Sequence, residues 1–396
     1  MRIVSEKDGA RSKNFQIALV SRIFHPEPSV AASTEHVFAQ ELAAAGHFVS
    51  VLTTKAPNLK VPKAEPGIKV SRWPALRDKN GYIKGIVQYL SFDIPSFFRV
   101  LALHPKPDFI LVEPPPTTGF MVNLAAKIRR IPYGYRVADL WSQAVTGTDT
   151  NKLVQKLLVW VEKAALRGAT MLFPVHEGVA ERLKEFGISK IPEPIGLGID
   201  TEEFEPYGDQ ITEHSGKQIL LYSGTASQVH GAEIFVEAFQ KIKIDFPDAI
   251  LVFLGQGTSF DNLKKIAANS NNRIEVRPRV ASTTAAKWIR SSVATLASVA
   301  PGKYGYAFPT KVYASVACGI PVIYSGAERA GKIVSDNNLG IATSYSADAV
   351  ADAMKVMLTR EKTDSAYLRN WAIGNISIRF VGKEVAKRIT DYLSDN

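Results

Sequence analysis

Residues 308–322 read FPTKVYASVACGIPV, and this pattern predicts one short helix between two buried strands. Thr310 is placed to cap a helix over residues 311–318, and Gly319 suits the left-handed position that follows a helix end. Pro321 then prevents the helix from continuing. The apolar runs on either side are typical of central parallel strands. The helix therefore begins just beyond the carboxyl end of a strand, where open α/β sheets bind ligands.

The beginning of this helix is a candidate phosphate site. The N–H groups of Lys311 and Val312 have no partners within the helix, and the Lys311 ammonium adds positive charge at the same place. The alternative is an ordinary crossover helix that contacts no ligand. This stretch by itself favours neither interpretation.

The second half of the chain repeats a unit of strand, small-residue loop and helix. We expect strands at residues 218–223, 249–254, 273–276, 293–300, 321–324 and 340–343. Gly224 and Gly255 follow the first two of these strands. Strands that alternate with helices predict a parallel, Rossmann-like sheet.

The first half shows the same alternation. We expect strands at residues 16–21, 47–53, 109–112, 133–137 and 171–175. Ser33 or Thr34 would cap a helix over residues 35–45, after a loop punctuated by prolines. Asp139 follows a strand and would present a functional carboxylate at the ligand-binding edge of the sheet. The first loop lacks G-x-G-x-x-G, so the pattern alone does not predict a dinucleotide site.

We therefore expect an α/β chain of two Rossmann-like, doubly wound domains that face a cleft. With 396 residues, of which 46% are hydrophobic, the chain can form two cores. The expected parts are a first domain (1–190), a connection (191–216), a second domain (217–375) and a final helix (376–396) that packs back on the first domain.

The net charge of +10 is concentrated in residues 55–106, which hold ten Lys and Arg against three acids. Aromatic residues are interleaved with them: Trp73, Tyr82, Tyr89, Phe92, Phe97 and Phe98. This composition suits an anionic membrane surface or a nucleic acid, and it equally suits a solvated loop and helix whose aromatics face the core. No recognised nucleic-acid motif is present, so no nucleic-acid partner is expected.

The cysteine count and the hydropathy pattern limit the cellular compartments in which the protein is expected. Cys318 is the single cysteine, which excludes an internal disulfide and a cysteine-built metal site and fits a reducing compartment. No apolar run approaches the roughly 20 residues that span a bilayer, and residues 1–14 lack the apolar core of a secretory signal. The chain is expected in the cytoplasm, with a peripheral position on the inner face of the cell membrane as an option.

Several strings, in this order and spacing, carry a resemblance to a known family. They are QIALVSRIFHPEPSVAASTEHVFAQELAAAGHFVSVLTT, DFILVEPPPTTG, YRVADLW, IPEPIGLGIDTEEFEP, LYSGTASQVHGAEIFVEAF, VFLGQG and FPTKVYASVACGIPV. From Gln16 onward the chain resembles the family 4 glycosyltransferases of the GT-B fold. The resemblance is greatest to the branch that builds capsule, O-antigen and colanic-acid-like polysaccharides.

The resemblance implies transfer of a sugar from a nucleotide diphosphate donor, with retention at the anomeric carbon and without a metal or other cofactor. A UDP-sugar is the first expectation for the donor. The acceptor would be a saccharide or lipid-linked saccharide of the cell envelope, and the basic segment 55–106 would then contact an anionic membrane. The second domain would hold the donor and the first domain the acceptor.

The resemblance also assigns roles to residues of this sequence. Lys311 and Asp139 would be the catalytic residues. Ser33, Thr34 and Trp141 would belong to the acceptor or phosphate loop. The donor would be bound by Gly224, Thr225, Gln228, His230, Gly255, Arg279, Val280, Tyr306, Pro309, Thr310, Val312 and Ala314.

Several positions depart from the family pattern. Tyr306 and Ala314 stand where two glutamates are usual. Gln228 and His230 stand where an arginine and a lysine usually bind the diphosphate. Further departures are Leu197, Gln256, Ala31 and Ala32.

These departures leave two interpretations open. In the first, Lys311, Arg279 and Lys303 supply the missing charge and the chain is an active transferase. In the second, the chain is a GT-B subunit with weak or no activity that binds a nucleotide sugar or supports a partner enzyme. A nucleotide-sugar 2-epimerase shares the architecture, but the strings fit it less well.

Overall fold

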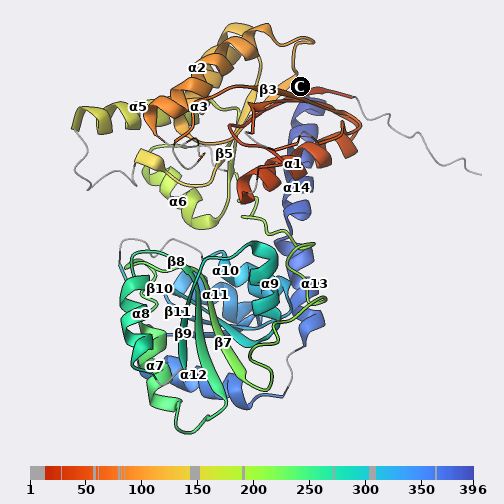
Figure 1. Ribbon diagram of the computed structural model, residues 1–396. Coiled ribbons are helices and arrows are strands. Elements are labelled where there is room, and N and C mark those ends of the chain that lie inside the picture. The colour runs from red at the N-terminus through yellow and green to blue at the C-terminus, as the bar shows by residue number, and fades with distance from the viewer. Residues whose placement is uncertain are drawn as a thin grey trace, which may run out of the picture. The chain divides into compact units, whose positions relative to one another are not determined.

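The chain forms two compact units. The computed structural model describes residues 14–27, 29–56, 59–60, 62–78, 81, 83, 85–142, 152–189, 192–270, 273–302, 309–361 and 364–396. Unit 1 comprises Met1–Gly196 together with Val381–Asn396, and unit 2 comprises Leu197–Phe380. Each unit contains one six-stranded parallel sheet flanked by helices (Figure 1). The expected pair of Rossmann-like α/β domains is therefore confirmed.

The sheet of unit 1 has the strand order β3-β2-β1-β4-β5-β6. Its strands are β1 (Gln16–Val20), β2 (Phe48–Thr54), β3 (Ile68–Trp73), β4 (Phe109–Val112), β5 (Tyr133–Val137) and β6 (Met171–Pro174). Its helices are α1 (Val30–Ala44), α2 (Ile86–Ala102), α3 (Pro116–Arg129), α5 (Lys152–Gly168), α6 (Glu177–Glu185) and α14 (Ile378–Asp395). The central strands are apolar along their length because helices cover both faces of the sheet.

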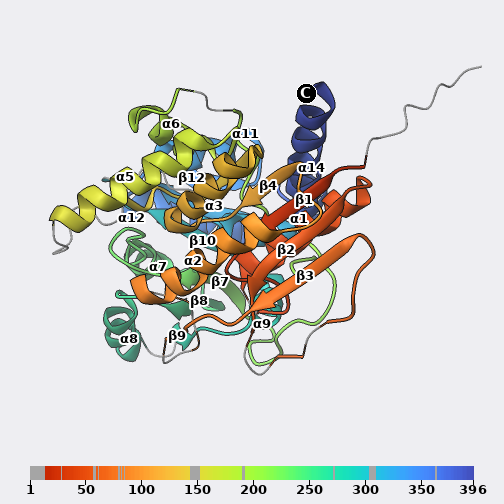
Figure 2. The ribbon, with the colours of Figure 1, turned by 90° about the horizontal axis from the view of Figure 1, so that it is seen from above.

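Helices from the two ends of the sequence share one core in unit 1. Ile17 and Leu19 of β1 pack against Phe38 of α1 and Val385 of α14. On the other side, α2 packs on α3 and α3 packs on α5, so these three helices lie side by side (Figure 2). The final helix is therefore part of the first unit's core, although it begins in unit 2.

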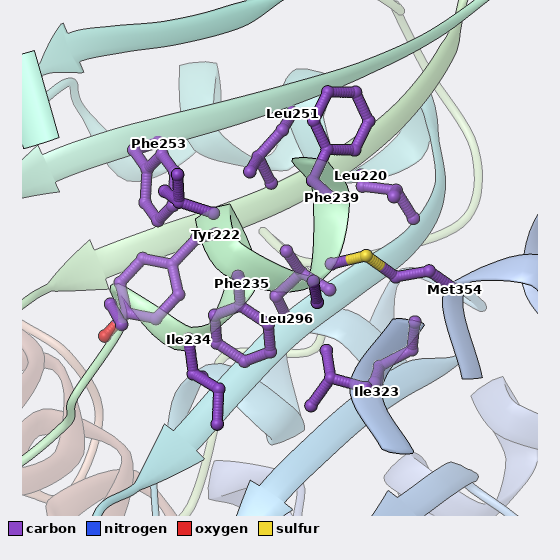
Figure 3. Close-up of a cluster of buried hydrophobic side chains, with 14 of the residues drawn as sticks. Leu220, Tyr222, Ile234, Phe235, Phe239, Leu251, Phe253, Leu296, Ile323 and Met354 are labelled. Carbon is purple, nitrogen blue, oxygen red and sulfur yellow. The ribbon is translucent and has the colours of Figure 1, made fainter. Parts of the chain in front are cut away.

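The sheet of unit 2 has the strand order β12-β11-β10-β7-β8-β9. Its strands are β7 (Gln218–Thr225), β8 (Ala249–Gln256), β9 (Ile274–Pro278), β10 (Ser292–Val299), β11 (Val322–Gly326) and β12 (Gly340–Thr343). Its helices are α7 (Ile234–Ile242), α8 (Phe260–Ala268), α9 (Ser282–Arg290), α10 (Lys311–Ala317), α11 (Glu328–Asp336), α12 (Ala347–Thr359) and α13 (Ser365–Asn375). Figure 3 shows part of its core, where Tyr222, Phe235, Phe253, Leu296 and Met354 are buried together.

The strand order reverses once in each sheet. In unit 1 the reversal lies between β1 and β4, and in unit 2 it lies between β7 and β10. At such a switch point the loops after the two strands turn to opposite faces and leave a crevice at the carboxyl ends of the strands. A ligand site is therefore expected at these two places.

Helix α1 begins earlier than the sequence analysis expected. Ser29 has an extended backbone and caps the helix, because its hydroxyl accepts a hydrogen bond from the N–H of Ala32 at 3.1 Å. The expected caps, Ser33 and Thr34, are wrong because both residues lie inside the helix. Thr34 is buried, and its hydroxyl donates to the carbonyl of Val30 at 2.8 Å.

Two elements inside the basic segment 55–106 were not located from the sequence. Strand β3 is an edge strand whose residues are half-buried or exposed, so it lacks the apolar run that marked the other strands. Helix α2 contains Pro95, which obscures its helical pattern.

Candidate functional site

Lys311 lies at the switch point of unit 2. It is the first residue of α10, which follows β10, and its side chain reaches back to the end of β7. The Nζ atom donates hydrogen bonds to the hydroxyl oxygen of Tyr222 at 2.5 Å and to the carbonyl oxygen of Thr225 at 3.2 Å. The ammonium also lies 3.9 Å from the centroid of the Tyr222 ring. A positioned positive charge therefore occupies the place where doubly wound sheets bind ligands.

Two glycines make this arrangement possible. Gly224 has a φ of +130°, and a Cβ atom there would lie 3.4 Å from Cε of Lys311. Gly255, on the adjoining strand, allows a close backbone approach, because a Cβ atom would lie 2.0 Å from the carbonyl oxygen of Gly224. A side chain at Gly224 would strain the backbone because of its positive φ, and a side chain at Gly255 would force the strand ends apart.

The charge of Lys311 has no carboxylate partner among the residues of unit 2 that the structure describes. Its polar contacts in the described part of the chain are a phenol and a carbonyl, with no carboxylate among them. Burial lowers the pKa of its ammonium to about 7. A buried cation without a counter-ion is unfavourable, and an anion bound beside it would both relieve this cost and raise the pKa.

His230 adds no charge to this site at neutral pH. Burial, and then the positive charge of Lys311, lower the pKa of its imidazole to about 4. Its Nδ1 lies 2.9 Å from the hydroxyl oxygen of Ser227, which holds the ring within the turn after β7. Gln228 is exposed in the same turn. Gln228 and His230 therefore supply no positive charge to this edge of the sheet at neutral pH.

The beginning of α10 differs from the phosphate site expected from the sequence. The N–H of Val312 donates to the carbonyl of Pro309 at 3.0 Å, so it is not free for a ligand. Thr310 has helical dihedral angles and makes no side-chain capping bond, so its expected capping role is wrong. Any anion site here consequently depends on the Lys311 ammonium rather than on the helix terminus.

The switch point of unit 1 holds a cluster of charged and polar groups that we call the acid cluster: Ser21, Glu35, Glu113 and Arg136. Nη1 of Arg136 lies 3.3 Å from a carboxylate oxygen of Glu35, and the Ser21 hydroxyl is hydrogen-bonded to Glu113. All four side chains are buried. Burial raises the pKa of both carboxyl groups, and Arg136 opposes the rise.

Asp139 and Trp141 follow β5, at the same edge of unit 1. Asp139 is exposed, and its carboxylate accepts a hydrogen bond from the N–H of Leu140 at 2.9 Å. The N–H of Trp141 donates to the buried Glu162 at 2.8 Å, and its ring meets Tyr89 edge to face at 5.6 Å. An exposed carboxylate beside a partly exposed aromatic ring suits the binding of a hydroxyl-rich ligand.

Two family models match this chain. Residues 32–195 match the family described as glycosyl transferase 4-like domain, and residues 204–371 match glycosyl transferases group 1. Together the two matches extend over most of both units. The chain belongs to the family 4-like glycosyltransferases. No curated protein matches the sequence.

Solved structures support the GT-B fold of this glycosyltransferase. Sucrose-phosphate synthase from Thermosynechococcus elongatus is 18% identical with a TM-score of 0.69, over 97% of this chain and 100% of that chain. Anabaena Alr3699/HepE in complex with UDP is 13% identical with a TM-score of 0.66, over 95% and 100%. WaaG, a glycosyltransferase involved in lipopolysaccharide biosynthesis, is 14% identical with a TM-score of 0.59, over 96% and 100%.

The remaining expected donor residues of the glycosyltransferase are dispersed. Arg279 is exposed after the edge strand β9, and Val280 packs against the apolar cluster beneath it. Ala314 lies on α10, partly buried between two apolar clusters. Tyr306 and Lys303 lie outside the described residues.

Two features of the glycosyltransferase were missed from the sequence. One is the acid cluster, which joins residues about one hundred positions apart. The other is the pairing of Lys311 with Tyr222. The Tyr222 phenol lies in a strand that is otherwise mostly apolar, so the sequence pattern did not mark it as a residue of the site. Among the described residues, no group of three or more His, Cys, Asp or Glu side chains is placed to hold a metal ion.

Proposed function

We propose that this glycosyltransferase moves a sugar from a UDP-sugar to a saccharide or lipid-linked saccharide of the cell envelope, with retention and without a metal. The observation that carries the proposal is the Lys311 ammonium, which lies at the switch point of unit 2 with no carboxylate partner among the described residues. A diphosphate is the anion that this reaction class brings to such a place.

The proposed step breaks the bond between the anomeric carbon and the β-phosphate oxygen and forms a bond from that carbon to an acceptor hydroxyl oxygen. The departing diphosphate takes the electron pair of the broken bond and so gains negative charge, and the acceptor hydroxyl releases its proton to that diphosphate. Lys311 stabilises that charge, with the loop that contains Gly224 and Thr225 beside it. In this proposal unit 2 is the donor domain and unit 1 is the acceptor domain, where Asp139 and Trp141 contact the sugar hydroxyls and ring.

The identity of the donor is proposed by comparison. The Anabaena protein was solved with UDP and also with UDP-glucose, and WaaG acts in lipopolysaccharide biosynthesis. These relatives support a uridine nucleotide and a cell-envelope acceptor. The single buried cysteine is compatible with the proposed cytoplasmic location, with the membrane as the source of a lipid-linked acceptor.

A second candidate function is a weakly active or inactive subunit that binds a nucleotide sugar or supports a partner enzyme. The observation in its favour is the uncharged state of His230, together with Gln228 and Ala314 at positions that carry charge elsewhere in the family. With Lys311 as the remaining cation at the end of β7 in the described residues, leaving-group stabilisation would be reduced.

Calorimetric titration with UDP, GDP and ADP, first without metal and then with magnesium, tests both candidates. Micromolar binding of UDP in the absence of metal, with weaker binding of the other two, is the expected result. Transfer from UDP-sugars then separates an active enzyme from a binding subunit. If none of the three nucleotides binds, the proposed donor site is wrong and a partner protein should be sought.

A further inference from the structure

Three adjacent helices of unit 1 expose an unusual number of apolar side chains. Ten of the 22 large hydrophobic side chains that are exposed in the described residues lie on α2, α3 and α5. They are Ile86, Val87, Ile94, Phe98, Leu124, Ile128, Leu153, Val154, Leu157 and Trp160. Scattered apolar residues are normal on a protein surface, but a contiguous group marks an interaction site.

The exposed residues form stripes on neighbouring helices. On α2, Ile94 and Phe98 are one turn apart, and on α5, Leu157 and Trp160 are similarly spaced. Helices α3 and α5 adjoin at the rings of Phe120 and Trp160, whose centroids are 5.2 Å apart, and α2 packs on α3. Phe98 and Leu157 are each 60% exposed and Trp160 is 57% exposed. Figure 2 shows the three helices side by side.

The exposed charges on these helices are of one sign. Their exposed charged residues are Lys127, Lys152, Lys156 and Arg167. The structure describes every residue of α2, α3 and α5, and Asp93 and Glu162 are the only acids among them. Both are buried, where Asp93 accepts a bond from the Thr118 hydroxyl and Glu162 accepts bonds from backbone N–H groups. The exposed face is consequently apolar and cationic.

We propose that the outer face of α2, α3 and α5 docks on an anionic lipid bilayer. Leucine, phenylalanine and tryptophan side chains would enter the headgroup boundary, while the lysines contact acidic lipids. None of the described helices is long and apolar enough to cross a membrane, so the contact lies along the surface. Two copies of this face would bring like charges together, which favours a lipid surface over a second copy of the chain.

This face shares only α2 with the segment 55–106 that the sequence indicated. Within residues 55–106, Arg77 pairs with Glu27 at 2.8 Å, and Arg99 donates to backbone carbonyls at the edge of the sheet. Both Arg77 and Arg99 are therefore bonded to groups of unit 1. The lysines of α3 and α5 lie outside that segment and provide the charge instead.

Flotation of the full-length chain with vesicles tests the proposal, in the absence of any nucleotide. We expect binding to vesicles of equal parts phosphatidylglycerol and phosphatidylcholine, weak binding to phosphatidylcholine alone, and a decline as salt rises. Reversal of two charges in Lys152→Glu/Lys156→Glu should weaken binding roughly thirtyfold or more, since each lysine near such a surface contributes about 1 kcal/mol. Leu157→Gln should weaken it severalfold.

Matched controls lie on exposed positions of unit 2. Lys264→Glu/Lys265→Glu on α8 makes the same change in net charge, and Ile244→Gln replaces a side chain that is 85% exposed. Both should keep full vesicle binding. The proposal is overturned if the controls lose as much as the α5 variants, if vesicles never bind, or if the chain is a dimer that Leu157→Gln converts to a monomer. UDP titration of the same variants reports separately on the proposed donor site.

Discussion

The two switch points of the molecule occupy equivalent places in two similar sheets, but they differ in whether their charged side chains have charged partners. In unit 1, Glu35 pairs with the buried Arg136 and Glu113 is hydrogen-bonded to Ser21, so each buried acid has a partner within the unit. In unit 2, Lys311 meets a phenol and a carbonyl. This difference fits the proposed function, in which the unit 2 edge receives an anion and the unit 1 edge receives a neutral hydroxyl.

The change with the largest expected effect removes the unbalanced charge. Lys311→Met keeps the apolar stem but not the ammonium, and should lower sugar transfer roughly a hundredfold to a thousandfold, as expected for a group that stabilises the leaving group. Steady-state kinetics and UDP calorimetry measure the effect, with circular dichroism to confirm folding. Lys332→Met, on an exposed helix position, is the matched control. Equal activity of the two variants would contradict the proposed role of Lys311.

The next change removes the positive charge of Arg136 from the acid cluster of unit 1. Arg136→Met leaves Glu35 and Glu113 buried without their cation, and should destabilise unit 1 by about 3 kcal/mol. Urea unfolding followed by tryptophan fluorescence measures the shift of the midpoint. The double variant Arg136→Met/Glu35→Gln should recover part of the loss. If Arg136→Met alone unfolds at the wild-type midpoint, the acid cluster is not held together by this charge.

The third prediction concerns the pH dependence of nucleotide binding. The pKa of Lys311 is about 7 in the free protein, and a bound diphosphate should raise it. Between about pH 7 and pH 9, binding then takes up a proton, so UDP affinity should fall as the pH rises, approaching tenfold per unit. Calorimetry in buffers of different ionisation enthalpy measures the proton uptake. The slope should disappear in Lys311→Met and persist in Lys332→Met.

The smallest expected effect is on the pH dependence of stability, and it arises from Glu113 in the acid cluster. The Ser21 hydroxyl has one proton and lies within hydrogen-bonding distance of both the Ile23 carbonyl and Glu113, which fits a protonated Glu113 that donates to Ser21. Because burial raises the pKa of Glu113, the folded protein holds a proton that the unfolded chain releases. Stability should therefore fall as the pH rises above about 4.5.

Glu113→Gln tests this assignment. The amide cannot lose a proton, so the decline of the melting temperature as the pH rises above about 4.5 should be shallower than in the wild type. At the acid end of this range the change should cost less than about 1 kcal/mol. Glu237→Gln, at an exposed carboxyl on α7, should leave the decline unchanged. A wild-type decline in Glu113→Gln would show that other groups cause it.

Much of the fold was predictable because its strands are buried on both faces. The run FILV of β4 is apolar throughout, QILLYS of β7 has an apolar and buried centre, and a proline or a glycine marks where each run stops. The edge strand β3 could not be found in this way, since water covers one side of it. The beginning of α1 was misplaced because Ser29, Ser33 and Thr34 are equally good caps in sequence, and tertiary packing selects among them.

The candidate site was only partly predictable. Lys311 and Gly224 were predicted to belong to the site because they lie at the beginning of a helix and the end of a strand, and the structure brings them together. The pairing of Glu35 with Arg136 spans 101 positions, and no local pattern connects residues that far apart. The shifted pKa of His230 likewise depends on burial and on Lys311, which a sequence does not display.

The path of α14 has a consequence for how the protein is made. Val381, Val385 and Ile389 complete the core of unit 1, yet they are synthesised after the whole of unit 2. While a ribosome is still adding residues 197–380, the nascent first unit exposes an apolar surface that only the last helix can cover. Folding from the amino terminus onward cannot finish this unit, so chaperones have a long interval in which to bind it. A premature stop codon near residue 380 should therefore disable the domain that was translated first.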